Sequence, residues 1–189
     1  MPRRLDISSA AFAGFSVLYP IIAIALIHAE GPGAALVVLL VVLCARLAVP
    51  VLQNVPVSLG LALLPVLAAV AAVGAFDRPL AVRLYPVFMN AAMLSVFAVT
   101  LWRPPSMIER FARILVPDLP QSGIRYTYRV TIVWIAFFAL NGAIALWSAL
   151  QPGWTAWTLY NGFLSYAAAG VLFIGEYFVR RRVLRRHRP

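Results

Sequence analysis

Five polar side chains lie inside otherwise apolar stretches of this sequence, where their chemistry would have the greatest effect. They are Asn90, Asn141, Asn161, Ser165 and Glu176. A polar group at membrane depth is costly unless it is hydrogen-bonded or paired, so its position is informative. Amides in such segments commonly join neighbouring helices, which is the interpretation we favour. The alternative is a polar path for substrate headgroups or protons.

Three of these residues share one face of a predicted helix, because Asn161, Ser165, Ala168, Leu172 and Glu176 recur at intervals of three or four residues. Asn90 and Asn141 lie in two earlier apolar stretches.

Glu176 is the one acidic residue well inside an apolar stretch. An unpaired buried carboxylate would be neutralised, so an arginine at the same depth is the expected partner. Arg129 begins the preceding antiparallel stretch and is the first choice, and Arg125 is the second. The sequence therefore predicts a structural ion pair, with a proton relay at Glu176 as the alternative.

Common catalytic constellations are missing from the sequence. The two histidines and the single cysteine, Cys44, are scattered, so no metal site is predicted, and no cofactor-binding motif was found. No glycine-rich phosphate loop and no G-x-S-x-G motif occurs. No catalytic residue is assigned, and the sequence favours a non-enzymatic role without deciding the question.

The composition indicates a membrane protein. The 189 residues are 63% hydrophobic and contain 16 basic and six acidic residues, and the mean hydropathy is +0.89. Such a chain fits a bilayer better than water, as one integral membrane domain spanning 1–189. The net charge of +10 is then explained by topology and by anionic lipid rather than by nucleic acid.

Six apolar stretches are long enough for transmembrane helices, since roughly 20 residues cross a hydrocarbon core of about 30 Å. The predicted fold is therefore an all-α bundle of six transmembrane helices plus one short interfacial amphipathic helix. The predicted spans are 10–28, 33–49, 57–76, 84–101, 130–150 and 157–179, followed by a basic tail at 180–189.

The arginines predict the orientation. All basic residues are arginines, and counting alternate sides of six spans leaves only Arg78 and Arg83 on one side. The positive-inside rule then puts both termini and the connector 102–129 in the cytoplasm, at a bacterial inner membrane. Contacts with headgroups or a partner are expected from Arg110, Arg113, Arg180, Arg181, Arg182, Arg185 and Arg186.

The amphipathic helix is predicted at 106–116. Ser106 and Glu109 have the spacing of a capping box. Met107, Ile108, Phe111, Ile114 and Leu115 cluster on one helical face, opposite Glu109, Arg110 and Arg113. The pattern suits a helix in the headgroup plane, and the alternative is a helix packed under the bundle.

Three segments carry a resemblance. The segments are YPVFMNAAMLSVFAVTLWRPPSMIERFAR (85–113), YTYRVTIVWIAFFALNGAIAL (126–146) and WTLYNGFLSYAAAGVLFIGEYFVRRR (157–182). They resemble a family of uncharacterised bacterial inner-membrane proteins. The genes of that family accompany ketosynthase and acyl-carrier genes, including clusters for aryl polyene or xanthomonadin-type pigments. The resemblance implies a pathway context and no catalytic residues.

The sequence and the resemblance together predict an accessory protein for synthesis, handling or export of a lipid-linked polyene or acyl product. Its basic side would contact anionic lipid headgroups, an acyl carrier protein or a membrane enzyme. Two alternatives stay open: a small-molecule or lipid transporter with a polar path in the bundle, and a structural partner subunit of a membrane enzyme.

Overall fold

The computed structural model describes residues 22, 25–27, 29–52 and 63–186, and nearly all of them are helical. The described part is therefore all-α, as predicted. Its elements are α2 (Pro32–Leu52), α4 (Leu64–Gly74), α5 (Arg78–Trp102), α6 (Met107–Leu115), α7 (Gln121–Leu150), α8 (Thr155–Leu159), the π-helix η1 (Tyr160–Leu164) and α9 (Ser165–Arg186).

Three helical stretches in the described residues are long and apolar enough to cross a membrane: Arg78–Trp102, Gln121–Leu150 and Thr155–Phe178. The 25 residues of α5 correspond to about 37 Å, which exceeds a hydrocarbon core of about 30 Å. The structure thus supports a membrane protein but not the predicted count of six transmembrane helices.

Two of the predicted spans fall on shorter apolar stretches of the described residues. In the predicted span 57–76, helix α4 is described from Leu64, with Pro65 in its first turn, and it has 11 residues, about 16 Å. Helix α2 has 21 residues, and its described apolar stretch is Pro32–Ala45. Most of the first predicted span, 10–28, lies outside the described residues.

The long helices begin earlier than hydropathy predicts. Helix α5 starts at Arg78 rather than at residue 84, because Asp77 caps it by accepting a hydrogen bond from the Leu80 amide at 2.9 Å. Helix α7 follows Pro120 and starts at Gln121 rather than at residue 130. Both extensions add charged residues, which a search for apolar stretches necessarily leaves out.

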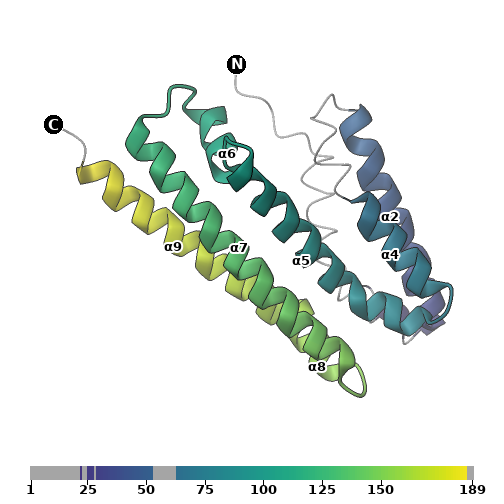
Figure 1. The fold of residues 1–189 in the computed structure, drawn as a ribbon. Helices are drawn as coiled ribbons and strands as arrows, with labels where there is room; N and C mark the ends of the chain where they lie inside the picture. Colours follow the sequence, from purple (N-terminus) through teal and green to yellow (C-terminus); the bar gives the residue numbers. More distant parts are fainter. Residues whose placement is uncertain (1–21, 23–24, 28, 53–62, 187–189) are drawn as a thin grey trace.

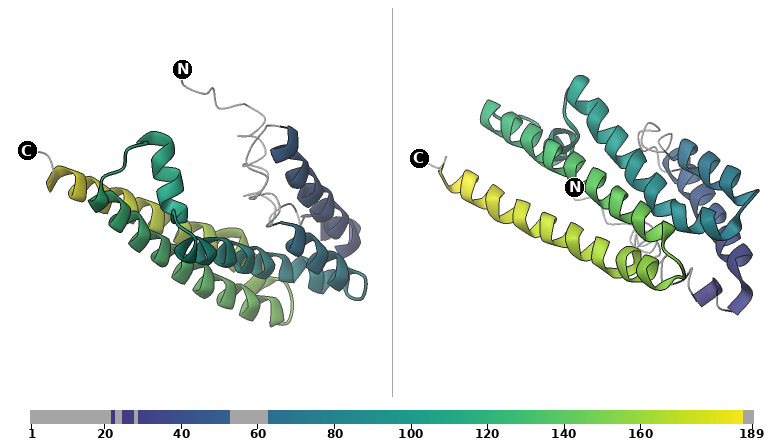
Figure 2. Two further views of the ribbon diagram at one scale, coloured as in Figure 1. Left: turned by 45° about the horizontal axis from the view of Figure 1, so that its top comes forward. Right: turned by 60° about the horizontal axis from the view of Figure 1, so that its bottom comes forward.

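Helices α5, α7 and α9 run alongside one another, with α7 between the other two (Figures 1 and 2). Helices α2 and α4 pack on the N-terminal half of α5 (Figure 1). The end of α5, helix α6, the start of α7 and the end of α9 gather at one end of this arrangement. The α4–α5 and α7–α8 turns lie toward the other end, and Gly153 supplies the positive φ of 75° in the second turn.

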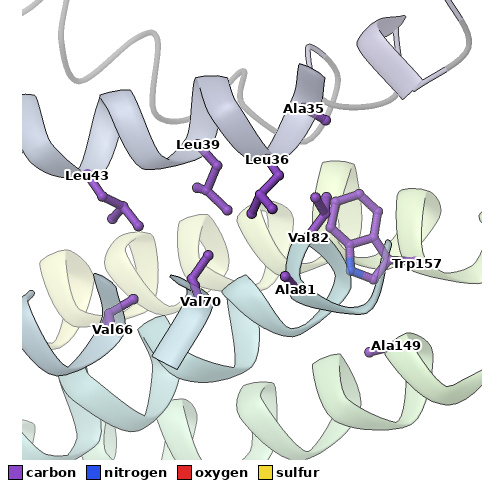
Figure 3. Packing of buried hydrophobic residues seen from close by; sticks show 10 residues of the cluster. All are labelled: Ala35, Leu36, Leu39, Leu43, Val66, Val70, Ala81, Val82, Ala149 and Trp157. Atoms are coloured by element: carbon purple, nitrogen blue, oxygen red, sulfur yellow. The ribbon is translucent and has the colours of Figure 1, made fainter. Parts of the chain in front are cut away.

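The largest group of buried apolar side chains joins α2, α4 and α5 to α8 (Figure 3). Leu39, Leu43, Val70 and Val82 are fully buried there beside Trp157. A second cluster centres on Trp134 of α7, whose ring lies 6.5 Å from that of Phe97 in α5 and 4.6 Å from that of Phe173 in α9. Aromatic side chains thus connect the three long helices.

Most of the remaining apolar surface faces outward. Trp157 and Asn161 are the only buried residues of the Thr155–Phe178 stretch, and Val171, Phe173 and Ile174 are each more than half exposed. Water would penalise this surface at roughly 25 cal/mol per Å², whereas lipid chains would not. The long helices therefore have the surface of membrane-embedded segments.

Candidate functional site

A chain of hydrogen bonds joins three helical elements at mid-depth. The Asn141 amide nitrogen of α7 donates to Asn90 Oδ1 of α5 at 2.9 Å, and Asn90 Nδ2 donates to the Pro86 carbonyl at 2.8 Å. Tyr160 of η1 donates its hydroxyl proton to Asn141 Oδ1 at 2.7 Å. Asn90 and Asn141, which lie in separate apolar stretches of the sequence, are thus hydrogen-bonded to each other.

The π-helix η1 explains how Asn161 reaches the same helix as Tyr160. Asn161 is buried, and its Nδ2 donates at 3.0 Å both to Ser148 Oγ in α7 and to the Trp157 carbonyl. A π-helix has a wider turn than an α-helix, so the angle between successive side chains around the helix axis differs. In η1 the adjacent residues Tyr160 and Asn161 both bond to α7. Ser148 itself donates to the Ala145 carbonyl at 2.8 Å.

These contacts make the network a set of cross-links. Both Asn141 and Asn90 use their amide nitrogen as donor and their carbonyl oxygen as acceptor. Because these side-chain amides form hydrogen bonds within the protein, they need no ligand to be stable inside a membrane. In the part of the chain that the structure describes, no group of three His, Cys, Asp or Glu side chains could hold a metal ion.

The predicted polar face of the last long helix is only partly directed toward the bundle. Ser165 Oγ bonds to the Asn161 carbonyl of its own helix at 3.4 Å. Leu172 packs in the cluster around Trp134, whereas Ala168 is exposed. This face of the helix is therefore partly packed against the bundle and partly exposed.

The predicted ion pair of Glu176 is not observed. Tyr126 of α7 donates its hydroxyl group to Glu176 Oε1 at 3.4 Å. Among the described side chains, the single ion pair joins Arg113 to Glu109, so neither Arg129 nor Arg125 lies within 4.0 Å of the Glu176 carboxylate. Antiparallel helices at equal depth were correctly expected to meet, but the residue of α7 that faces Glu176 is a tyrosine.

Helix α6 is fixed to the bundle by threonines from two neighbouring helices. The Met107 amide donates to Thr100 Oγ1 of α5 at 2.9 Å, and the Ile108 amide donates to Thr131 Oγ1 of α7 at 3.3 Å. These bonds satisfy two of the amides that a helix N-terminus leaves without intrahelical partners. The outer side chains Phe111 and Ile114 remain exposed.

The predicted capping box of α6 is wrong. Ser106 occupies the N-cap position, but its hydroxyl makes no cap hydrogen bond and finds no partner among the described residues. Glu109, which is 6% exposed, instead binds Arg113 through Nη2 at 2.7 Å and Nε at 2.9 Å. The threonines of α5 and α7 replace the local cap, a tertiary contact that local spacing could not reveal.

Two of the predicted contact arginines, Arg110 and Arg113, lie on α6. Arg110 donates to the carbonyls of Pro105 at 2.9 Å and Arg103 at 3.3 Å, so its side chain is held against the preceding loop. Arg125 and Arg129 are exposed on the first turns of α7. The backbone of α9 stays helical to Arg186, but the side chains of Arg180, Arg181, Arg182, Arg185 and Arg186 lie outside the described part.

Sequence reasoning missed Tyr160, Ser148 and Arg83 as members of polar contacts. Tyrosine and serine are common in membrane helices, so their types carried no signal without the positions of their partners. A comparison with protein-family models, curated proteins and solved structures found no match.

Proposed function

We propose that this chain is a multi-pass protein of a bacterial inner membrane that serves as an accessory to synthesis, handling or export of a lipid-linked polyene or acyl product. The end that carries α6 faces the cytoplasm in this proposal. Helices α5 and α9 then run inward and α7 runs outward. Both chain termini are cytoplasmic if the residues before α5 cross the membrane an odd number of times.

The separation of the arginines supports this orientation most directly. Arg103, Arg110, Arg113, Arg125 and Arg129 lie around α6 and the first turns of α7, while Arg78 and Arg83 lie toward the opposite end of α5. Positively charged residues are enriched on the cytoplasmic side of membrane proteins. A cationic surface of this kind attracts anionic headgroups and acidic carrier proteins.

The firm attachment of α6 supports a docking role at that end. Its first amides are bonded to α5 and α7, so α6 presents Phe111 and Ile114 to the membrane surface in a fixed position. The satisfied amides of Asn90 and Asn141 favour this accessory role over transport, because they act as cross-links between helices.

Orientation is tested by reporter fusions. A reporter active only in the periplasm should be silent when fused after Pro189 and active when fused after Gly153. The opposite pattern would reverse the proposed orientation and place the arginine-rich end outside the cytoplasm.

Docking is tested with the purified full chain in nanodiscs and an acyl carrier protein loaded with a polyene chain. The double variant Arg125→Gln, Arg129→Gln should bind about tenfold more weakly at low salt, whereas Arg78→Gln at the other end should bind like the wild type. Equal binding by all three proteins would contradict docking at the basic end.

A further inference from the structure

Arg83 lies toward the end of the bundle opposite α6, and its positive charge is only partly compensated. It lies about 7.5 Å along α5 from the first residue, Arg78, and is partly buried. Its side chain bonds to Gln151 in the turn between α7 and α8, and this turn lies toward the end of the bundle opposite α6 (Figure 1). Its contacts therefore belong to a different region from the proposed docking end.

The side chain of Arg83 is held in a fixed position. Nη1 donates to the Gln151 carbonyl at 3.1 Å, and the guanidinium carbon lies 4.4 Å from the centre of the Trp154 ring. Trp157, whose ring is nearly perpendicular to that of Trp154, donates from Nε1 to the Arg83 carbonyl at 2.9 Å. A guanidinium stacked in this way loses little further freedom when it binds an anion.

No carboxylate balances this cation within the described residues. Asp77 and Glu30 are exposed, and the only ion pair between described side chains is Arg113–Glu109. Nε of Arg83 is buried and has no hydrogen-bond partner in the same part of the chain. Burying an unpaired charge costs several kcal/mol. The Gln151 carbonyl and the Trp154 ring compensate only part of this cost for the Arg83 guanidinium.

We propose that Arg83, stacked on Trp154, forms a binding site for a phosphate group at the end of the bundle opposite α6. The fork of a guanidinium matches the oxygens of phosphate. Tryptophans are enriched at the headgroup level of a bilayer, which is the depth of lipid phosphates. The phosphate would come from a lipid headgroup or from a free anion, and this site is independent of the proposed accessory function.

The test is a titration of the full chain in nonionic micelles with dodecyl phosphate, followed by its thermal unfolding. The wild type should be stabilised, and Arg83→Gln should bind about tenfold more weakly, as expected when a charge-assisted bond is lost. Arg78→Gln, an exposed arginine on the same helix, is the matched control and should bind like the wild type. Dodecyltrimethylammonium should give no stabilisation that depends on Arg83.

The remaining outcomes distinguish a lipid phosphate from a free phosphate as the ligand, and a specific site from an effect of net charge. Stabilisation by inorganic phosphate equal to that by dodecyl phosphate would support the site with a free anion as ligand. Equal losses in Arg83→Gln and Arg78→Gln would overturn the proposal, because net charge alone would then explain binding. If Arg83→Gln does not fold, Arg83→Lys decides: at least threefold weaker binding supports the phosphate fork, and unchanged binding overturns it.

Discussion

Asn141 of α7 donates a hydrogen bond to Asn90 of α5 where the two helices pack closely. The donor and acceptor atoms are 2.9 Å apart. The residue after Asn141 is Gly142, and a Cβ atom added there would lie 3.1 Å from Asn90 Cβ. The hydrogen bond between Asn141 and Asn90 and the lack of a side chain at Gly142 thus both depend on the close approach of α5 and α7.

The first prediction concerns the energetic coupling of this pair. Asn90→Ala and Asn141→Ala should each lower the free energy of unfolding by about 1 kcal/mol, and the double variant should lose less than the sum by about 0.6 kcal/mol. Unfolding by a denaturing detergent in mixed micelles measures these values. Ser95→Ala is the control, because the exposed Ser95 hydroxyl bonds only to the Ala91 carbonyl of its own helix. Strict additivity of the two asparagine variants would show that the hydrogen bond contributes nothing.

The second prediction concerns Gly142. Gly142→Ala should lower the free energy of unfolding by about 1–2 kcal/mol, because the new methyl group forces α7 away from Asn90. Gly170→Ala is the matched control in α9, where nothing lies within 4 Å of the added Cβ. That control should be neutral or stabilising by up to about 1 kcal/mol, since alanine favours helix more than glycine does. A destabilisation in the control as large as that in Gly142→Ala would contradict close helix approach as the cause.

The sequence identifies the polar residues of the site better than it identifies their partners. The cost of burying an amide in an apolar segment makes Asn90 and Asn141 conspicuous in the sequence, but their bond to each other is visible only in the structure. Tyr160 was missed because tyrosine is common in membrane helices, so its residue type gives no signal without the position of its partner Asn141. Ser106 shows the same limitation, since a threonine from another helix replaces its capping role.

Hydropathy predicts the helical class and the three long helices, but it misjudges length. The cap formed by Asp77 moves the start of α5 into charged sequence. This effect arises from a backbone hydrogen bond rather than from transfer of side chains to lipid. Within the described residues, three helical stretches are long and apolar enough to cross a membrane.

The third prediction tests the surroundings of Glu176. Because Tyr126 contacts the Glu176 carboxylate while Arg125 and Arg129 form no ion pair with it, Glu176→Gln and Arg129→Leu should be additive in their effects on the free energy of unfolding, within about 0.5 kcal/mol. The same detergent-induced unfolding measures the cycle. A coupling above about 1 kcal/mol would restore the ion pair that the sequence predicts.

The last prediction concerns the attachment of α6, on which the docking proposal depends. Thr131 is fully buried, and its hydroxyl accepts the Ile108 amide at 3.3 Å while donating to the Thr127 carbonyl at 2.9 Å. Thr131→Val keeps the shape of the side chain but leaves the Ile108 amide without its acceptor, which should cost about 1–3 kcal/mol. Hydrogen–deuterium exchange at the first turn of α6 should therefore accelerate about tenfold or more.

The matched control for this variant is Thr158→Val, because the Thr158 hydroxyl bonds to the Trp154 carbonyl four residues earlier in its own helical segment. It removes the same kind of intrahelical bond but no bond to α6, so exchange in α6 should stay at the wild-type rate. Unchanged exchange in Thr131→Val would mean that packing of Met107 and Ile108 alone holds α6 in place. Faster exchange in both variants would point to a general loosening of the bundle, and the specific role of Thr131 would have to be abandoned.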